Sequence, residues 1–479
     1  MQELLAQPFV ENRWLKDETT KETIYNPYNG KSIGNQYTAS LEDVEKALQA
    51  AYKDKKEIGS IPSVKRAKIL KTAALLLEEE KETFAKLIAE ELGKPLKNTR
   101  DEVSRSIETL ELSGEEAKRL HGETIPGDAS ERGTTAMAST YRVPVGVIAA
   151  ITPFNAPLNL VCHKIGPAFA GGNVTILKPA PQTALIATAL LDLMLRAGLP
   201  ENAVHMLLGG VEIGQKIVQD DRVNVISFTG GTKASKNICD TAGMKKVLLE
   251  LGGNAATIVH HDADIQEAAK MSAKTGNSNS GQSCISVQRI YVHRSTLNEF
   301  SEALKTNVEQ LQLGDPLDAA TDIGSLVDEN AANRVKSWID EAVDGGAELL
   351  TGGVQYGATI TPTVLVNPKH EDKVVCEEVF GPLISVIPYD DIDEAITWAN
   401  DSEFGLQTGV FTKNIDLAYK VAHQIEAGGV IINGTSNFRL DHWPYGGVKN
   451  SGIGREGPRF AIEEMTEMKM VVLRLPANE

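Results

Sequence analysis

The chain has 479 residues, of which 42% are hydrophobic and 24% are charged, and these fractions exclude a wholly disordered or collagen-like protein. Its formal net charge of −17 repels phosphate backbones and anionic lipid, which argues against nucleic-acid binding and membrane-surface binding. At about 150 residues per domain, the length predicts roughly three domains or lobes.

Neither a targeting segment nor a metal site is predicted. Residues 1–14 contain charged side chains and lack the apolar run of a signal peptide. The longest uncharged run, residues 143–162, is interrupted by prolines and does not predict a membrane span. The four cysteines lie far apart, with no CxxC pair and no mixed His/Cys cluster, which argues against a zinc site. So few cysteines in a chain of this length favour a reducing compartment. We therefore expect a cytoplasmic protein without a metal.

Up to about residue 120 the sequence predicts helices. Residues 40–51 begin with a cap at Ser40, and residues 62–92 repeat apolar side chains at helical spacing. The middle of the chain changes to short β-branched runs at residues 145–151, 174–177, 204–208, 223–228 and 247–249. Helix-like stretches separate them at residues 183–197, 212–218 and 232–241. This alternation predicts a parallel sheet covered on both faces, which binds ligands beyond the carboxyl ends of its strands.

A second α/β section follows Leu251. Its predicted elements are a strand at residues 287–293 and helices at residues 297–311, 330–344, 391–400 and 415–426. Two α/β lobes with a cleft between them are therefore the predicted architecture. Residues 122–141 are rich in Gly, Thr and Ser, and the tail at residues 465–475 alternates, so both are candidate strands that leave the lobes.

Two glycine-containing turns follow strands of the first lobe. They read Gly209-Gly210-Val211-Glu212-Ile213-Gly214 and Phe228-Thr229-Gly230-Gly231-Thr232. A strand that ends in glycines before a helix aims free backbone N–H groups at an anion, although most such turns bind nothing.

Two further residues could carry chemistry. Glu250 ends the last strand of the first lobe beside two glycines, where it could enter a cleft, form an ion pair or cap a helix. Cys284 follows small polar residues, so it is either a nucleophile on an exposed loop or a small buried apolar residue.

Together these motifs resemble the aldehyde dehydrogenase superfamily. The matching motifs, in order, are Thr152-Pro153-Phe154-Asn155, Lys178-Pro179, Phe228-Thr229-Gly230-Gly231-Thr232, Glu250-Leu251-Gly252-Gly253, Gly281-Gln282-Ser283-Cys284, Glu378-Val379-Phe380-Gly381-Pro382 and Pro444-Tyr445-Gly446-Gly447. The resemblance implies a Rossmann-type cofactor lobe (residues 1–121 and 142–251) and an α/β catalytic lobe (residues 252–433). It also implies a small β-extension for oligomerisation (residues 122–141 and 465–479), and hence a homodimer or homotetramer.

The resemblance assigns a role to each catalytic candidate. Cys284 would attack the aldehyde carbon, and Asn155 together with the Cys284 backbone N–H would hold the oxyanion. Glu250 would activate water against the resulting thioester. Glu456 matches a second family glutamate linked to proton transfer, with a buried ion pair as the alternative.

NAD or NADP is the implied cofactor. The residues that match cofactor positions are Thr152, Pro153, Phe154, Lys178, Gly210, Gly214, Phe228, Gly230, Gly231, Leu251, Glu378 and Phe380. Gly231 replaces the usual serine at the pyrophosphate and keeps only a backbone N–H. Pro181 stands where many NAD-specific relatives have a glutamate that repels a 2′-phosphate, so the sequence leaves both nucleotides open.

Four residues match the substrate funnel of the family: Arg105, His163, Ser283 and Arg439. Two arginines and a histidine at the mouth of the substrate funnel favour a small aldehyde with a carboxylate, phosphate or sulfonate. The reason is that an arginine guanidinium forms paired hydrogen bonds with such groups. Pairing of the arginines with Glu102, Glu108 or Asp441 is the alternative. The loop before Pro444 is most similar to the branch of lactaldehyde and non-phosphorylating glyceraldehyde-3-phosphate dehydrogenases.

Three rival functions share some of these features. A CoA-acylating aldehyde dehydrogenase uses the same cysteine but generally lacks the base, so Glu250 argues against it. A non-catalytic protein on this scaffold would have lost Cys284 or Asn155, and both are present. A cysteine hydrolase would act without nucleotide, and its family signatures are absent.

Overall fold

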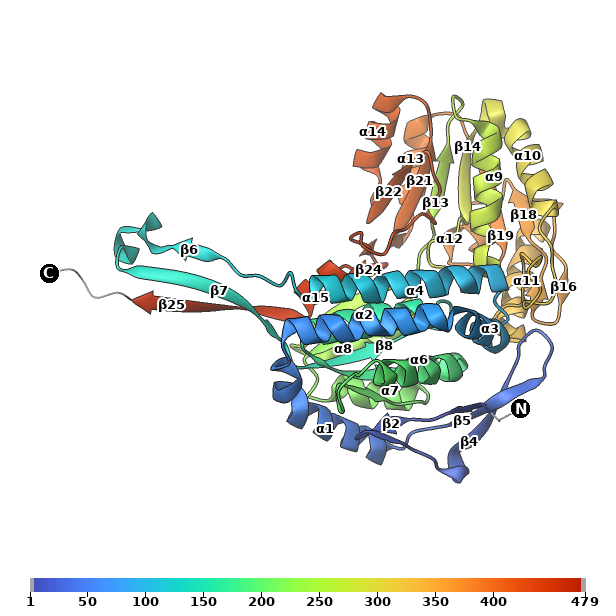
Figure 1. The fold of residues 1–479 in the computed structure, drawn as a ribbon. Helices are drawn as coiled ribbons and strands as arrows, with labels where there is room; N and C mark the ends of the chain where they lie inside the picture. The colour runs from blue at the N-terminus through green and yellow to red at the C-terminus, as the bar shows by residue number, and fades with distance from the viewer. Residues whose placement is uncertain (1–3, 475–479) are drawn as a thin grey trace.

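Two sheets form the centres of two α/β lobes in the computed structural model, which describes residues 4–474 (Figure 1). The strands of the first sheet, in spatial order, are β24 (Gly452–Ile453), β12 (Lys246–Glu250), β11 (Val225–Thr229), β8 (Val147–Ile151), β9 (Val174–Lys178), β10 (Val204–Met206), β2 (Phe9–Val10) and β3 (Arg13–Trp14). The strands from β12 to β10 are parallel, as the β-branched runs predict. Because β9, β11 and β12 end at Lys178, Thr229 and Glu250, these side chains share one edge of the sheet.

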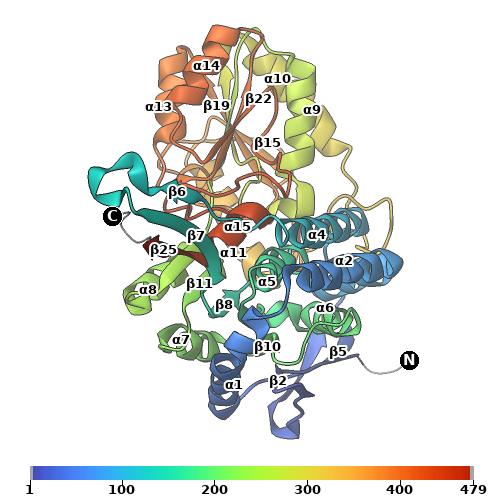
Figure 2. The same ribbon diagram turned by 60° about the vertical axis from the view of Figure 1, so that its left-hand side comes forward.

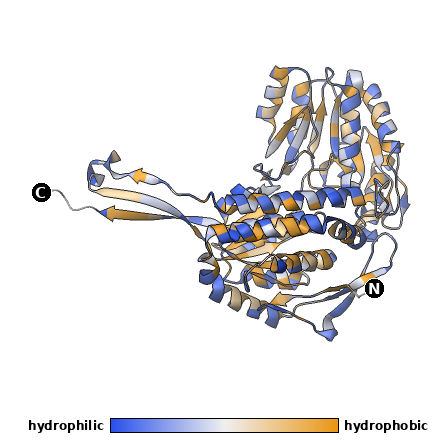
Figure 3. Ribbon diagram, viewed as in Figure 1, coloured by the Kyte–Doolittle hydropathy of each residue, from blue (hydrophilic) through white to orange (hydrophobic). Residues whose placement is uncertain are grey.

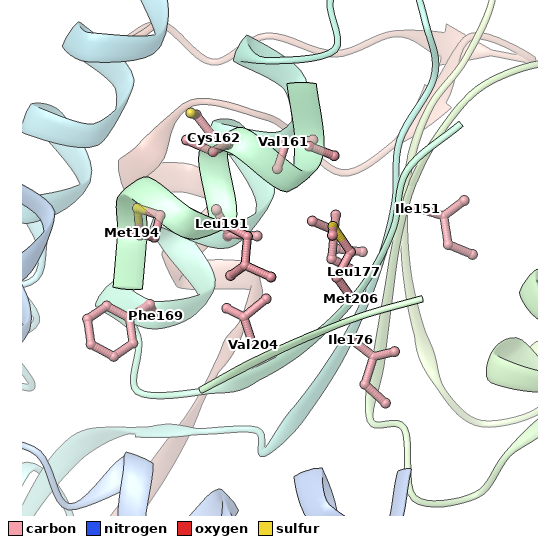
Figure 4. Close-up of a cluster of buried hydrophobic side chains, with 14 of the residues drawn as sticks. Ile151, Val161, Cys162, Phe169, Ile176, Leu177, Leu191, Met194, Val204 and Met206 are labelled. Atoms are coloured by element: carbon pink, nitrogen blue, oxygen red, sulfur yellow. The ribbon is translucent and has the colours of Figure 1, made fainter. Parts of the chain in front are cut away.

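Helices cover both faces of the first sheet. They are α1 (Leu41–Gly59), α2 (Ser63–Glu79), α3 (Lys81–Leu92), α4 (Leu96–Glu116), α5 (Asn159–Ala170), α6 (Ala184–Arg196), α7 (Val211–Gln219) and α8 (Thr232–Ala242). Helices α1 and α7 contact β8 and each other, while α5 contacts β8 and β9 and is backed by α2 and α4. Figure 4 shows the core between α5, α6 and the sheet, where Leu191 lies next to Val204 and faces Leu177 and Met206.

The N-terminal region departs from the prediction in two ways. The predicted helix at residues 62–92 is two helices, because the backbone turns at Glu80 between α2 and α3. The region before residue 40 contains strands that the helical interpretation missed: β1 (Leu4–Ala6), β4 (Lys21–Tyr25) and β5 (Ser32–Tyr37) join in a small sheet. Only Ile24 of β4 is buried, so this strand lacks the apolar pattern by which strands are recognised.

The second lobe is built on a seven-stranded sheet. Its strands, in spatial order, are β15 (Glu348–Thr351), β18 (Thr363–Val366), β19 (Leu383–Tyr389), β14 (Arg289–His293), β13 (Ala256–Val259), β21 (Gln407–Phe411) and β22 (Gly429–Ile432). Its helices are α9 (Ile265–Gly276), α10 (Leu297–Glu309), α11 (Glu329–Asp344), α12 (Lys373–Cys376), α13 (Ile392–Asn400) and α14 (Ile415–Gln424). Helix α10 contacts β14 and β18, α13 contacts β19, and α14 contacts β21. Figure 2 shows α9 and α10 on one side of this lobe and α13 and α14 on the other, so the sheet is covered on both faces.

A β-arm extends from the first lobe (Figures 1 and 2). It consists of β6 (Thr124–Pro126), β7 (Ala136–Pro144) and β25 (Thr466–Arg474), and β25 pairs with the whole length of β7 in antiparallel register. Apolar residues along β25 are exposed (Figure 3). Strands are thus present in the predicted segment 122–141, where β7 continues to Pro144, and in the predicted segment 465–475 as far as Arg474. Residues 475–479 of the predicted extension lie outside the described residues.

Residues 434–464, which the predicted domain boundaries left unassigned, begin against the second lobe, where Gly434 bridges to Val410, and end in the first lobe. There β24 pairs with β12 beside Glu250, and α15 (Pro458–Glu464) leads into the arm. The remaining short strands are β16 (Gln355–Tyr356), β17 (Thr359–Ile360), β20 (Phe404–Gly405) and β23 (Val448–Lys449). None of the helices within residues 4–474 has both the length and the apolarity needed to cross a bilayer.

Candidate active site

A cleft of about 400 Å³ lies beyond the carboxyl ends of β8, β9 and β11. Its lining includes Lys178, Gly210, Gly214 and Phe228, which are four of the predicted nucleotide residues, together with Pro181. A Cβ atom on Gly214 would stand 3.4 Å from Lys178 Cδ, so the glycine lets the lysine lie across the start of α7. Burial lowers the pKa of Lys178 to about 8, and its ammonium donates to the carbonyl of Pro179 at 3.3 Å. A buried cation with a single carbonyl partner in this cleft fits a hydroxyl or anionic ligand.

Two helix N-termini point toward this region. Gly210 precedes α7 and Gly231 precedes α8, and neither has a side chain that could cap the first backbone N–H groups. No described atom lies within 4 Å of a Cβ built on Gly210 or Gly231, so both positions are open to a ligand. Gly230 is different, because a Cβ there would lie 2.5 Å from the Phe228 ring. The geometry fits a phosphate-bearing group held by backbone donors.

The second lobe contributes Glu378 and Phe380. The Glu378 carboxylate accepts a hydrogen bond from the Gly253 N–H at 2.9 Å, and a Cβ on Gly252 would stand only 2.6 Å from that carboxylate. Burial raises the pKa of Glu378 to about 7. Phe380, at a left-handed φ of 50°, meets Phe154 edge to face with ring centroids 5.8 Å apart. The ring contact between Phe154 and Phe380 joins the two lobes.

A second cavity, of about 250 Å³, holds the predicted catalytic residues. The described residues that line it include Pro153, Phe154, Asn155, Gly230, Gly231, Glu250, Leu251, Cys284, Glu378, Phe380, Arg439, Tyr445 and Glu456. Four predicted residues line neither this cavity nor the larger cleft: Thr152, Arg105, His163 and Ser283. Thr152 donates its backbone N–H to the carbonyl of Lys178, and the Ser283 hydroxyl accepts from the Ile285 N–H, so both support the surrounding backbone.

Cys284 lies on a loop of unusual backbone conformation. Three consecutive residues before it, Asn279, Ser280 and Gly281, have φ values of 53°, 54° and 72°. A Cβ on Gly281 would lie 2.0 Å from the Gly381 carbonyl, so only glycine fits at this close approach. Burial raises the pKa of the Cys284 thiol to about 11, although a hydrogen bond with Tyr445 lowers it in part.

Asn155 is anchored by its backbone and by its side chain. Its carbonyl accepts from Lys94 Nζ at 3.0 Å and from Asn279 Nδ2 at 3.1 Å, and its own Nδ2 donates to the Gln282 carbonyl at 3.2 Å. Lys94 in turn pairs with Glu102 at 2.6 Å. The second N–H of the Asn155 amide is thus held near the cysteine loop, where it can donate to a developing oxyanion.

Glu250 and Glu456, two of the three carboxyl groups that line the cavity, have opposite pKa shifts. Burial and the nearby charge of Glu456 raise the pKa of Glu250 well above its ordinary value, and its Oε2 has no hydrogen-bond partner among the described residues. Burial would also raise the pKa of Glu456, but Lys164 at 3.5 Å and Arg439 at 3.0 Å outweigh it and lower this pKa to about 2. Such a separation suits Glu250 for accepting a proton and keeps Glu456 ionised.

The predicted anion-binding residues form an ion-pair cluster around Asp441. Arg105 makes two hydrogen bonds to Asp441, at 2.7 and 2.9 Å, and His163 Nε2 lies 2.8 Å from the same carboxylate. Arg439 reaches His163 at 3.2 Å and Glu456 at 3.0 Å. Arg105 therefore pairs with Asp441, which is one of the alternatives that the sequence left open. Arg439 is the member of the cluster that also lines the small cavity.

Sequence reasoning missed Lys164, and it quoted Tyr445 in a motif without giving it a role. Lys164 is a buried ammonium between Ser227 and Glu456, and a lysine inside a mostly apolar helix was a usable signal. Tyr445 Oη lies 3.2 Å from Cys284 Sγ, a contact between residues that are 161 positions apart. No group of three or more His, Cys, Asp or Glu side chains within residues 4–474 is arranged to hold a metal ion.

Comparisons with known proteins agree with the family resemblance of the sequence motifs. The profile described as the aldehyde dehydrogenase family matches residues 14–471. A 3-sulfolactaldehyde dehydrogenase of Priestia aryabhattai is 46% identical over 98% of each chain, and a lactaldehyde dehydrogenase of Methanococcus maripaludis is 40% identical over 97% of this chain and 99% of the relative. The NADP complex of the NADP-dependent glyceraldehyde-3-phosphate dehydrogenase of Bacillus halodurans superimposes with a TM-score of 0.96 at 36% identity, covering 98% of this chain and 99% of that one.

Proposed function

Because the chain belongs to the aldehyde dehydrogenase family, we propose that it oxidises a small anionic or hydroxylated aldehyde to its carboxylic acid through a thioester on Cys284. The protein is an enzyme, an NAD(P)-dependent oxidoreductase. The observation that carries the proposal is the shared cavity of about 250 Å³, in which Cys284, Asn155 and Glu250 come together with Arg439.

The reaction begins at the sulfur. Cys284 Sγ forms a bond to the aldehyde carbon, and the former carbonyl oxygen becomes an oxyanion. The Asn155 amide and the Cys284 backbone N–H hold this charge, which strengthens their hydrogen bonds relative to the free aldehyde. When bound, NAD or NADP supplies the acceptor for the hydride that leaves this carbon, so that a thioester remains on Cys284.

Glu250 completes the turnover. Its raised pKa and its unpaired oxygen suit it to take a proton from the water that attacks the thioester carbon. The C–S bond then breaks, releasing the carboxylic acid and the thiolate. Glu456 remains ionised between Lys164 and Arg439, and its negative charge helps Glu250 to retain a proton after accepting it.

The residues around the larger cleft fit a dinucleotide. Lys178 would donate to the adenosine ribose, and Gly210 and Gly214, at the start of α7, would lie beside the adenine. Gly231 at the N-terminus of α8 would face the pyrophosphate, and Glu378 with Phe380 would hold the nicotinamide end. With Pro181 in place of an acidic residue, nothing at that position repels a 2′-phosphate. We therefore assign the cofactor as NAD or NADP.

A small, polar substrate follows from the size of the cavity and from Arg439. Arg439 reaches the cavity with a side chain that is 8% exposed, and it is the cation available to an anionic substituent there. Arg105 could join it if the substrate anion replaced Asp441 as its partner. The 3-sulfolactaldehyde and lactaldehyde dehydrogenases among the relatives are named for small aldehydes of this kind.

We assign the domains by the same reasoning. Residues 1–121 and 142–251 would bind the nucleotide, residues 252–433 would carry the nucleophile, and the β-arm would join subunits into a homodimer or homotetramer. The long row of exposed apolar residues on β25 supports this last assignment.

Product analysis with a panel of aldehydes tests the proposal. We expect lactaldehyde, sulfolactaldehyde or another small polar aldehyde to yield its free acid and one equivalent of reduced nucleotide, with NAD, NADP or both. A requirement for CoA with an acyl-CoA product would instead indicate the acylating reaction. Product formed without any nucleotide would contradict the proposal.

A further inference from the structure

The side chain of Tyr445 contacts the reacting sulfur, and the proposed reaction gives it no role. Its hydroxyl oxygen lies 3.2 Å from Cys284 Sγ, and the side chain is buried in a small cluster with Ile285 and Leu406. The contact joins the loop that carries Cys284 to the C-terminal loop that carries Tyr445. A hydroxyl at this distance can exchange a hydrogen bond with the sulfur.

Neighbouring residues hold both the backbone and the ring of Tyr445 in place. The backbone N–H of Tyr445 donates to the Glu456 carbonyl at 3.1 Å, and the N–H of Glu456 donates back at 2.6 Å. The Arg439 guanidinium lies over the ring, 3.7 Å from its centroid, while its Nη2 pairs with Glu456. Because Glu456 holds the Tyr445 backbone, and Arg439, which is itself paired with Glu456, covers the ring, the hydroxyl has little freedom to move away from the sulfur.

The direction of the hydrogen bond follows from the chemistry of the two groups. A thiol is a weak donor and a weak acceptor, whereas a thiolate is a strong acceptor with no proton to give. A neutral phenol that can donate therefore favours the ionised sulfur more than the neutral one. Burial raises the pKa of the Tyr445 hydroxyl well above its usual value, so the phenol keeps its proton.

We propose that the Tyr445 hydroxyl is a catalytic group that donates a hydrogen bond to the Cys284 thiolate and stabilises the ionised nucleophile. The inference rests on the proposed role of Cys284. No proton passes from Tyr445 to the sulfur; the phenol keeps it while the sulfur attacks the aldehyde carbon. The other ionisable groups that face Cys284 are Glu378 and Glu250, which oppose the thiolate when charged, and Arg439, which favours it.

Alkylation of Cys284 by iodoacetamide measures the thiolate directly. The full-length enzyme and its Tyr445→Phe variant are alkylated between pH 6 and 9, and the modified Cys284 peptide is followed by mass spectrometry, so that the exposed Cys239 and Cys376 do not contribute. Tyr389→Phe is the matched control, because it removes another buried hydroxyl, 2.9 Å from His260. Below the midpoint of ionisation the rate is proportional to the thiolate fraction.

We expect Tyr445→Phe to slow alkylation roughly 10- to 100-fold across this range, since a hydrogen bond to a charged group shifts an ionisation by about one to two pH units. Tyr389→Phe should leave the rate unchanged. Incorporation of a ring-fluorinated tyrosine at position 445 separates donation from packing, because a more acidic phenol of nearly the same shape is a stronger donor. That enzyme should be alkylated faster than the native one.

Two results would overturn the inference. Alkylation of Tyr445→Phe within twofold of the native rate would mean that the hydroxyl does not stabilise the thiolate. Slower alkylation of the fluorinated enzyme would mean that the hydroxyl accepts a hydrogen bond from a neutral thiol. Failure of the proposed function is distinguishable, because it would appear as residual turnover in Cys284→Ser, whereas the alkylation rates report only the ionisation of the sulfur.

Discussion

Arg105 on α4 and Asp441 in the C-terminal loop are 336 positions apart, yet their side chains form a two-pronged salt bridge with N···O distances of 2.7 and 2.9 Å. Burial of Asp441 would raise its pKa, but His163 and Arg105 hold it well below its usual range. The Asp441 carboxylate therefore stays ionised and offsets part of the positive charge that the sequence predicts at the mouth of the substrate funnel. An anionic substrate must compete with it for Arg105, while Arg439 is reached from the cavity itself.

The first prediction concerns the nucleophile. Cys284→Ser should abolish aldehyde oxidation while nucleotide binding is retained, because a serine hydroxyl has a far higher pKa than a thiol. Steady-state rates and calorimetric titration with NAD and NADP check both halves. Replacement of Cys162, Cys239 or Cys376 by Ala should leave activity largely intact. Activity of Cys284→Ser near the native level would refute the assignment.

The second prediction concerns deacylation. Glu250→Gln should give a single burst of reduced nucleotide and then a steady rate that is slower by about 10²–10⁴-fold, since only hydrolysis needs the general base. In the native enzyme the steady rate should rise with pH as Glu250 loses its proton, because burial and the charge of Glu456 raise the pKa of this base well above its ordinary value. The variant should lose this rise. Stopped-flow absorbance at several pH values tests both points, and normal turnover would make Glu250 structural.

The third prediction concerns Lys178, whose buried ammonium has a pKa of about 8. The charged form is the donor, so nucleotide affinity should be greatest below pH 8 and should fall by up to tenfold per pH unit above it. NADP should be affected more than NAD, because its 2′-phosphate also gains from the charge. Lys178→Met should bind weakly and without this pH dependence. Titration calorimetry between pH 6.5 and 9.5 decides it, and an unchanged native affinity at pH 9.5 would count against it.

The fourth prediction concerns assembly. Deletion of the residues after Thr466 removes β25, which exposes the edge of β7 and takes away the apolar row that ends at Leu473. The truncated chain should be monomeric or aggregated, while the full chain should be a dimer or tetramer by sedimentation velocity. A full-length chain that sediments as a monomer at micromolar concentration would rule out the proposed role of the arm.

The fold could be predicted where burial leaves a trace in the residue types. The strands from β8 to β12 are continuous apolar runs, because helices cover both of their faces, and their positions were predicted nearly to their ends. The N-terminal strands could not be found in this way. Their pairing satisfies backbone groups at an exposed edge, and residues such as Lys21 and Glu22 carry no sign of it.

The site shows the same division. The predicted catalytic residues stand at strand ends or in glycine-rich loops, so local pattern and family resemblance locate them. The contacts that these residues make with their partners cannot be located in this way. The sequence offered Asp441 as one of three acceptors for the arginines and could not choose among them, and it gave Tyr445 no role beside Cys284, because both contacts depend on how the C-terminal loop folds back over the first lobe.

The last prediction concerns substrate charge. If Arg439 and Arg105 hold the far end of the substrate, Arg439→Ala and Arg105→Ala should raise KM more than they lower kcat, because the contact exists in the ground and transition states alike. A charge-assisted hydrogen bond corresponds to roughly 10- to 150-fold in kcat/KM. Since Arg439 also supports Glu456 and Tyr445, the informative quantity is the ratio of kcat/KM for a carboxylated or sulfonated aldehyde to that for propanal, in which shared structural losses cancel. This ratio should fall in both variants and should fall for the native enzyme as salt is added, because screening weakens the charge pair.

Arg119→Ala, which removes an exposed arginine just beyond α4, is the matched control and should leave this ratio of kcat/KM values unchanged. An unchanged ratio in Arg439→Ala and Arg105→Ala would mean that Asp441 and Glu456 are the only anions these arginines serve, and an uncharged hydroxyaldehyde such as lactaldehyde would then be the better substrate.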